Sequence, residues 1–364
     1  MQQDNNEKYS FQKFIQLWLI PIVLTFFLIV ISFFPTVVEN YYSTGLYPHI
    51  SKFQRKIFGL LNFSIGDVFY FLVIFTLLKK IIKLIRFIIK KDARKNFGNS
   101  LLIGLRTILW LFIFFQILWG LNYYRTGIAH QLKIDKEDYT KQDVELLICD
   151  IVQKLNTIRP LISNDSLPQP SFKNIIEEAI QLYDTIKPTY HFINYQNNAV
   201  KKSLFSNVSH YIGFTGYYNP FSGEAQLSTN IPKILAPYIV CHEIAHQLGY
   251  AQEDEANFVG YLVCSKSANL YFQYSVYLDL YKYAATELLM MNEKNTHAWE
   301  LNSLVRKDLK DIRSFFLSQE NKLEPFMTAL YGQYLKANRQ SKGLDSYNDI
   351  IGLLISKKKK YGGI

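Results

Sequence analysis

The chain has 364 residues, of which 49% are hydrophobic and 16% aromatic, and its formal net charge is +10. The basic residues gather between two apolar stretches without any nucleic-acid-binding motif, which argues against a nucleic-acid partner and for a membrane surface. Three cysteines, Cys149, Cys241 and Cys264, fit neither a dense disulfide framework nor a thiolate zinc site.

The first third of the chain predicts three membrane-spanning helices. Residues 14–34 carry no charge, and a helix of that length crosses a hydrocarbon core about 30 Å thick. Residues 60–78 predict a second span with Asp67 as its one charged residue, and residues 101–121 predict a third. We therefore expect residues 1–124 to form a helical membrane anchor.

The charge between the second and third spans predicts the orientation of the chain. Eight basic residues and one acid lie in residues 79–95, which the positive-inside rule places in the cytoplasm. Three spans then put the N-terminus inside and everything after Tyr123 outside. We expect a multi-pass membrane protein in contact with lipid; in a bacterial cell it would lie in the cytoplasmic (inner) membrane, with its remaining part facing the periplasm or the exterior.

Residues 125–364 predict one globular domain. Helical spacing occurs at residues 143–155 and 172–184, and again from Pro237 onward. Residues 211–227 are rich in aromatic residues, Thr and Gly, and predict one or two short strands joined by a turn at residues 219–223. The expected fold is thus a three-span α-helical anchor followed by a mainly helical α+β domain with a small sheet.

The segment His242-Glu243-Ile244-Ala245-His246 carries the predicted chemistry. Two histidines four residues apart share one face of a helix, so both imidazoles can bind one Zn²⁺. Glu243 is rotated by about 100° from His242 and lies beside the metal, where it can act as general base toward a metal-activated water. The preceding residues 236–241 are apolar, which is typical of a buried active-site helix.

The third ligand follows after a short turn. Gln252 occupies the position at which the longer metzincin pattern has a third histidine. The segment from Glu253 to Asn257 instead resembles the glutamate-zincin signature E-x-x-A-[DN], which implies Glu253 as ligand and Asn257 as the residue that steadies a zinc-bound histidine. The two lie on one helical face, whereas Glu255 is rotated by about 200° and is the alternative ligand. In the simpler interpretation, Glu253 and Glu255 bind no metal and are present because acidic residues stabilise a helix N-terminus.

The gap between the motif and Glu253 is shorter than in glutamate zincins. Six residues separate His246 from Glu253, so a tight helix–turn–helix is required, and Gly249 makes it feasible.

A family resemblance extends over essentially the whole chain. Three N-terminal spans, the segment GYYNPFSGEAQL and the segment VCHEIAHQLGYAQEDEANFVGYL look like domain of unknown function family 3810, bacterial membrane proteins regarded as metallopeptidases on their HExxH motif. The resemblance implies a zincin-like domain, a Zn²⁺ cofactor and a location in the cell envelope. It implies no particular substrate.

Residues 213–227 could form the edge strand that binds an extended peptide, with Tyr217, Tyr218 and Asn219 placed to stabilise the oxyanion. Ordinary aromatic packing is the alternative. The predicted function is a membrane-anchored zinc metallopeptidase acting on a peptide or protein substrate in the cell envelope. A non-proteolytic zinc-binding envelope or sensor protein and a zinc amidase of cell-wall peptides are the alternatives.

Overall fold

The computed structural model describes residues 2–89, 97–135, 138–162, 170–291 and 300–364. Its elements, in chain order, are α1 (Gln2–Ser32), α2 (Pro35–Val37), η1 (Val38–Leu46), α3 (Tyr47–Phe58), α4 (Ile65–Ile89), α5 (Phe97–Leu118), η3 (Gly120–Tyr124), α6 (Gly127–Gln131), α7 (Lys141–Ile162), α8 (Phe172–Ile186), β1 (Val200–Lys202), α9 (Ser209–Ile212), β2 (Gly216–Asn219), β3 (Glu224–Leu227), η4 (Lys233–Leu235), α10 (Ala236–Gln247), α11 (Glu253–Cys264), α12 (Leu270–Met290), α13 (Ser303–Gln319), α14 (Glu324–Ala337), η5 (Gly343–Asp349) and α15 (Ile350–Tyr361). The protein is mostly helical with one small sheet, as the sequence predicted.

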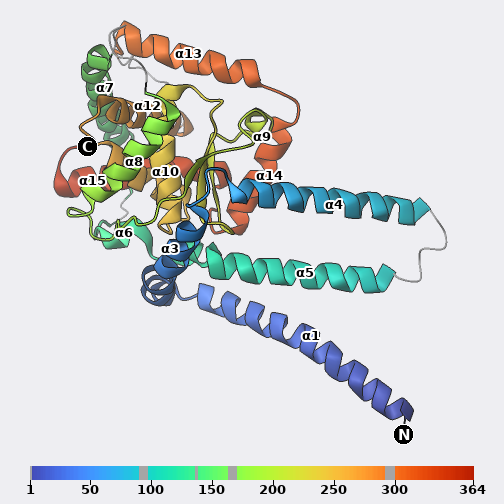
Figure 1. Cartoon of the computed structure of the whole chain (residues 1–364). Coiled ribbons are helices and arrows are strands. Elements are labelled where there is room, and N and C mark those ends of the chain that lie inside the picture. Colours follow the sequence, from blue (N-terminus) through green and yellow to red (C-terminus); the bar gives the residue numbers. More distant parts are fainter. Residues whose placement is uncertain (1, 90–96, 136–137, 163–169, 292–299) are drawn as a thin grey trace.

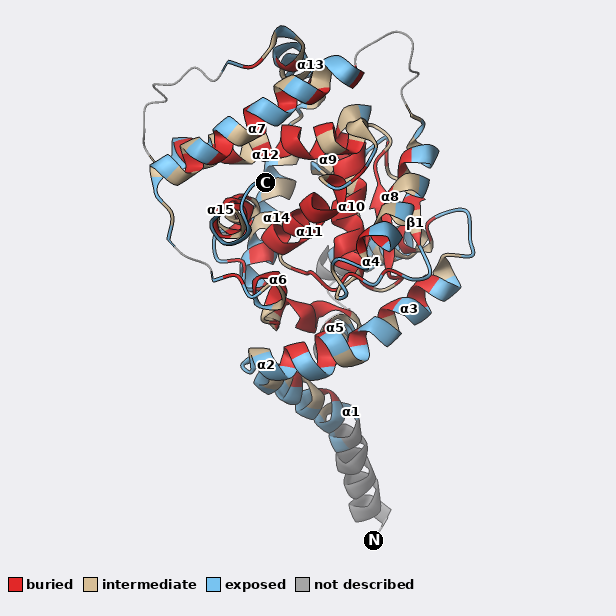
Figure 2. Ribbon diagram, turned by 90° about the vertical axis from the view of Figure 1, so that its left-hand side faces the viewer, coloured by how far each residue is buried: buried red, intermediate tan, exposed pale blue. Residues whose placement is uncertain are grey.

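Helices α10 and α11 lie at the centre of the globular body and are buried along almost their whole length (Figure 2). Helix α10 packs against α8, α11, α12 and strands β2 and β3. Its apolar residues explain this position, because Val240, Ile244 and Ala245 are fully buried in the main hydrophobic core. Pro237 stands in the first turn of α10, where a proline is tolerated.

The sheet has three strands in the order β1-β3-β2. Strand β3 pairs in parallel with β1 and antiparallel with β2, with Tyr218 opposite Ala225. Strands β2 and β3 form the hairpin predicted for residues 211–227, and its turn ends at Gly223, whose φ of 67° favours glycine. Strand β2 pairs only with β3 among the described strands, so it lies at an edge of the sheet.

Helices α1, α4 and α5 project from one side of the globular body (Figure 1). Among the helices in the described part of the chain, α5 alone is long and apolar enough to cross a membrane, with a mean hydropathy of 2.2 over Leu101–Leu118 and 11% of that window buried. Leu17–Ser32 and Pro35–Phe58, bent by 101°, meet the same criteria as a pair. One or two candidate spans are therefore found in the described part of the chain, where the sequence predicted three.

The predicted second span differs from the structure at its beginning. Helix α4 starts at Ile65 rather than at residue 60. Asp67, expected within the bilayer, is fully buried against the domain, where its carboxylate accepts hydrogen bonds from Leu204 N (2.7 Å), Ser203 Oγ (3.2 Å) and the Tyr217 hydroxyl. The basic stretch that predicts the orientation of the chain continues into residues 90–96, which lie outside the described residues.

A buried glutamate fixes the first turn of α4 to the sheet. Glu224, on β3, is fully buried and accepts hydrogen bonds from Gly66 N (2.5 Å), Ile65 N (3.2 Å) and Ser64 Oγ (3.1 Å). A carboxylate suits this place, since the first N–H groups of a helix lack partners within it. The first turn of α4 thus belongs to the globular body, and its later turns project.

Candidate metal centre

Three predicted ligands meet between α10 and α11. His242 Nε2 lies 3.2 Å and His246 Nε2 lies 3.5 Å from the same oxygen, Glu253 Oε2. All three side chains are buried, and they form a group that could hold a metal ion. Two atoms bound to one tetrahedral zinc at about 2.0–2.1 Å would be about 3.3–3.4 Å apart, so the spacing of these donors fits such an ion.

The turn between the two helices brings the acid to the histidines. Helix α10 ends at Gln247, and Gly249 follows with a φ of 89°, which only glycine adopts readily. Glu253 is then the first residue of α11, and its N–H donates to Gln340 Oε1 at 3.0 Å. The tight helix–turn–helix expected from the sequence is therefore present, with Gly249 at the turn.

Hydrogen bonding and charge orient the two imidazoles differently. His246 Nδ1 lies 2.7 Å from the carbonyl oxygen of Tyr250, which leaves Nε2 facing Glu253.

Burial lowers the pKa of His246, but the Glu253 carboxylate has the larger, opposite effect and raises this pKa to about 9. Burial raises the pKa of Glu253, and the two histidines outweigh this and hold it well below its usual range. Nδ1 of His242 is buried and finds no hydrogen-bond partner among the described residues.

Glu243 lies beside the group formed by His242, His246 and Glu253 and is 6% exposed. Burial raises its pKa to about 7, although the neighbouring His242 and His246 lower it. Its Oε2 is buried without a hydrogen-bond partner in the described part of the chain. A Cβ on Gly216 would come within 2.7 Å of its Oε1, so the edge strand β2 passes directly over this carboxylate.

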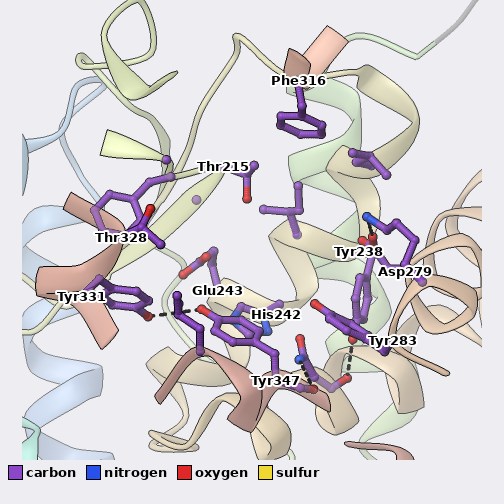
Figure 3. Close-up of a pocket in the computed structure, with 18 of the residues that line it drawn as sticks. Thr215, Tyr238, His242, Glu243, Asp279, Tyr283, Phe316, Thr328, Tyr331 and Tyr347 are labelled. Atoms are coloured by element: carbon purple, nitrogen blue, oxygen red, sulfur yellow. Dashed lines mark hydrogen bonds and ion pairs between the residues drawn. The ribbon is translucent and has the colours of Figure 1, made fainter. Parts of the chain in front are cut away.

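Two tyrosines complete the site, and the sequence did not predict them. The Tyr331 hydroxyl, on α14, donates to Glu253 Oε1 at 2.7 Å and lies 3.2 Å from the Tyr347 hydroxyl. The ring of Tyr347, in η5, is nearly parallel to that of His242, with centroids 6.3 Å apart. Figure 3 shows both tyrosines next to Glu243 and His242. Both residues are far from the motif in sequence, and only the general richness in tyrosine hints at them.

Glu255 and Asn257 have other partners. Glu255 Oε1 accepts a hydrogen bond from Ile128 N at 3.0 Å, at the start of α6. Asn257 Nδ2 donates to the carbonyl oxygen of Tyr347 at 3.4 Å, so its hydrogen bond supports the segment that packs on His242 rather than a histidine directly.

The three candidates for the oxyanion lie at different places, and the Tyr217 hydroxyl donates to Asp67. Tyr218 lines the cavity above the histidines, and its hydroxyl lies 3.3 Å from that of Tyr47. Asn219 is fully buried and is not one of the described residues that line this cavity. Its Oδ1 accepts hydrogen bonds from Phe221 N and Ser222 N and so holds the hairpin turn.

The carbonyl end of α10 is completed by side chains from the first third of the chain. Gln247 O accepts hydrogen bonds from Ser51 Oγ (2.6 Å) and Arg55 Nη1 (2.9 Å), and His246 O accepts one from Trp119 Nε1 (3.2 Å). These donors satisfy carbonyls that a helix end leaves free. They also cross the boundary expected at residues 124/125.

A cavity of about 670 Å³ opens onto all four side chains of the site, His242, Glu243, His246 and Glu253. A second cavity of about 300 Å³ shares His242 and Glu243 and continues toward Asp279 (Figure 3). The carboxylate beside the donor group is therefore accessible to a ligand from two sides.

Comparison with known proteins yields one match. No curated protein and no solved structure matches the chain. The family model described as "Protein of unknown function (DUF3810)" matches residues 42–355, which include both segments of the predicted resemblance. The chain belongs to this family of proteins of unknown function.

Proposed function

We propose that this protein is a membrane-anchored, zincin-like zinc metallopeptidase that hydrolyses a peptide or protein in the cell envelope. The observation that carries the proposal is the convergence of His242, His246 and Glu253 on one point, with Glu243 beside it at the floor of a cavity. Two imidazoles and one carboxylate suit Zn²⁺, and three protein ligands leave a position open, as catalytic zinc sites do.

A bound Zn²⁺ would polarise a peptide carbonyl and make a water molecule more acidic. Glu243 accepts the proton that water loses and returns it to the leaving amine, so that water adds across the C–N bond and gives a carboxylate and an amine. Tyr331 keeps Glu253 in place, and Tyr218 is the proposed contact for the oxyanion.

The edge strand β2 offers a binding site for an extended peptide substrate. Strand β2 lies at the edge of the sheet and passes over Glu243 at Gly216. An extended peptide that added to this edge would place its backbone along the metal centre, and its amide groups would find partners on β2.

We propose the three-span topology with the N-terminus inside and the catalytic domain outside. It is supported by α1, α4 and α5, which project together and expose large apolar side chains such as Phe26 (68%), Phe71 (57%) and Ile108 (63%). The basic residues that follow the apolar part of α4 agree with a cytoplasmic loop.

The test uses the full-length protein in phospholipid vesicles, assayed for bound zinc and for cleavage of a peptide library. Glu243→Gln should keep about one zinc per chain and lose at least about 100-fold in turnover, as expected for loss of a general base. The exposed Glu300→Gln serves as control and should match the wild type. A wild-type protein without zinc, or unaltered turnover in Glu243→Gln, would overturn the proposal.

A further inference from the structure

The cavity above the metal centre extends to the projecting helices. Its walls include Tyr70, Val73 and Ile74 of α4, and Phe115 at the end of α5. Ile74 lies nine residues into α4, about 13 Å along the helix at 1.5 Å per residue. The cavity therefore joins the metal centre to the part of the molecule that carries the candidate membrane span.

The walls of this cavity are more apolar than their many tyrosines suggest. The Tyr217 hydroxyl donates to Asp67, and the Tyr123 and Tyr334 hydroxyls lie 3.1 Å apart. The Tyr331 hydroxyl is likewise engaged, with Glu253 and Tyr347. The rings are left to face the cavity, so a ligand here meets mainly apolar surface away from the metal centre.

The rim on the side of α4 exposes large apolar side chains to the surroundings. Ile74 is 53% exposed, and Val208 and Tyr211, which also line the cavity, are 47% and 45% exposed. The segment that carries Val208 is hydrogen-bonded to the first turn of α4, because Leu204 N donates to Asp67. An exposed apolar rim that continues onto a projecting apolar helix is suited to contact with lipid.

The chemistry of the cavity restricts what can enter. An extended peptide in the apolar part would leave its amide groups without partners, at a cost of several kcal/mol each. A hydrocarbon chain has no such groups.

From these observations, and resting on the proposed peptidase function, we infer that the substrate is a lipidated peptide. Its acyl chain lies in the apolar part of the cavity, between α4, the end of α5 and residues 205–214, and its peptide part extends along β2 to the metal centre. The substrate would then reach the site from the lipid leaflet next to the domain and not from bulk water.

The experiment maps where an acyl chain binds, without requiring hydrolysis. A palmitoylated peptide with a diazirine near the end of its acyl chain is added to full-length Glu243→Gln protein in phosphatidylethanolamine–phosphatidylglycerol vesicles. After irradiation, the labelled residues are identified by mass spectrometry. Label is expected at the cavity-lining residues Tyr70, Val73, Ile74, Phe205, Val208 and Tyr211. Val73→Trp, which fills the cavity, should reduce this label at least fivefold. Leu72→Trp, on an exposed position that does not line the cavity, should leave it unchanged.

The outcomes separate the two proposals. Label confined to the outward faces of α1, α4 and α5, or equal label in Val73→Trp and Leu72→Trp, would overturn the lipidated substrate even if wild-type protein cleaves other peptides. Label within the cavity, lost in Val73→Trp, would support it even if the wild type cleaves nothing, and in that case only the peptidase proposal fails. Cleavage by the wild type that is faster for the acylated peptide than for the same peptide without its chain would support both.

Discussion

Replacing Tyr331 with phenylalanine removes one hydroxyl from the support of Glu253 and keeps the ring. The lost hydrogen bond is 2.7 Å long and holds the ligand carboxylate by the oxygen that does not face the histidines. Loss of such an outer partner typically weakens metal binding 10- to 100-fold. We therefore expect the dissociation constant for zinc to rise by that factor in Tyr331→Phe, a change of about 1.4–2.8 kcal/mol.

The measurement is competition against a chromogenic chelator, using metal-stripped full-length protein in detergent. Tyr139→Phe is the matched control, because the Tyr139 hydroxyl also donates to a carboxylate, Glu287, at 2.7 Å but is not part of the metal group. The control should bind zinc like the wild type. Equal zinc affinity in Tyr331→Phe and the wild type, or an equal loss in both variants, would refute the reasoning.

Three further predictions concern the ligand, the edge strand and a buried ion pair. Glu253→Gln should lose its zinc while Glu255→Gln keeps it, and the reverse result in metal analysis would exchange their roles. Gly216→Ala should keep zinc and lose roughly 100-fold in turnover, since its Cβ displaces Glu243; unchanged turnover would contradict the placement of the strand. Burial raises the pKa of Glu39, but the ion pair with the buried Arg125 outweighs burial and lowers this pKa below its ordinary value of 4.5. The ion pair therefore stabilises the folded protein above pH 4.5, and this stabilisation is lost as the pH falls through the folded-state pKa. The difference in Tm between wild type and Glu39→Gln should shrink below pH 4.5, and a constant difference would argue against it.

The grouping of His242, His246 and Glu253 was predictable because the three residues are close together in the chain. His242 and His246 share a helical face by their spacing alone, and a glycine at the turn is enough to return Glu253 to them. The hairpin was predictable for a similar reason, since two short strands and their turn fall within one aromatic, glycine-containing segment. In both cases local spacing determines which side chains can meet.

The remainder of the site depends on packing between distant elements, which leaves no local pattern. Tyr331 and Tyr347 reach the centre only because η5 packs against α11, and α14 packs against η5 and α9. Asp67 was interpreted as an isolated charge in a span, because hydropathy averaged over a window does not register that its partners, Ser203 and Leu204, come from another part of the chain. The expected role of Asn257 differed because its neighbour is the Tyr347 segment rather than an imidazole.

The hydrogen bonds at the carbonyl end of α10 determine what can be purified. A protein cut at residue 125 would retain every proposed zinc ligand and yet lose Ser51, Arg55 and Trp119, which bind the carbonyls of His246 and Gln247. Each buried carbonyl left without a partner costs about 1–3 kcal/mol, a substantial part of the stability of an ordinary domain. Detergent or a bilayer is therefore a requirement for working with the metal centre itself, and a water-soluble fragment would be a poor guide to its affinity for zinc.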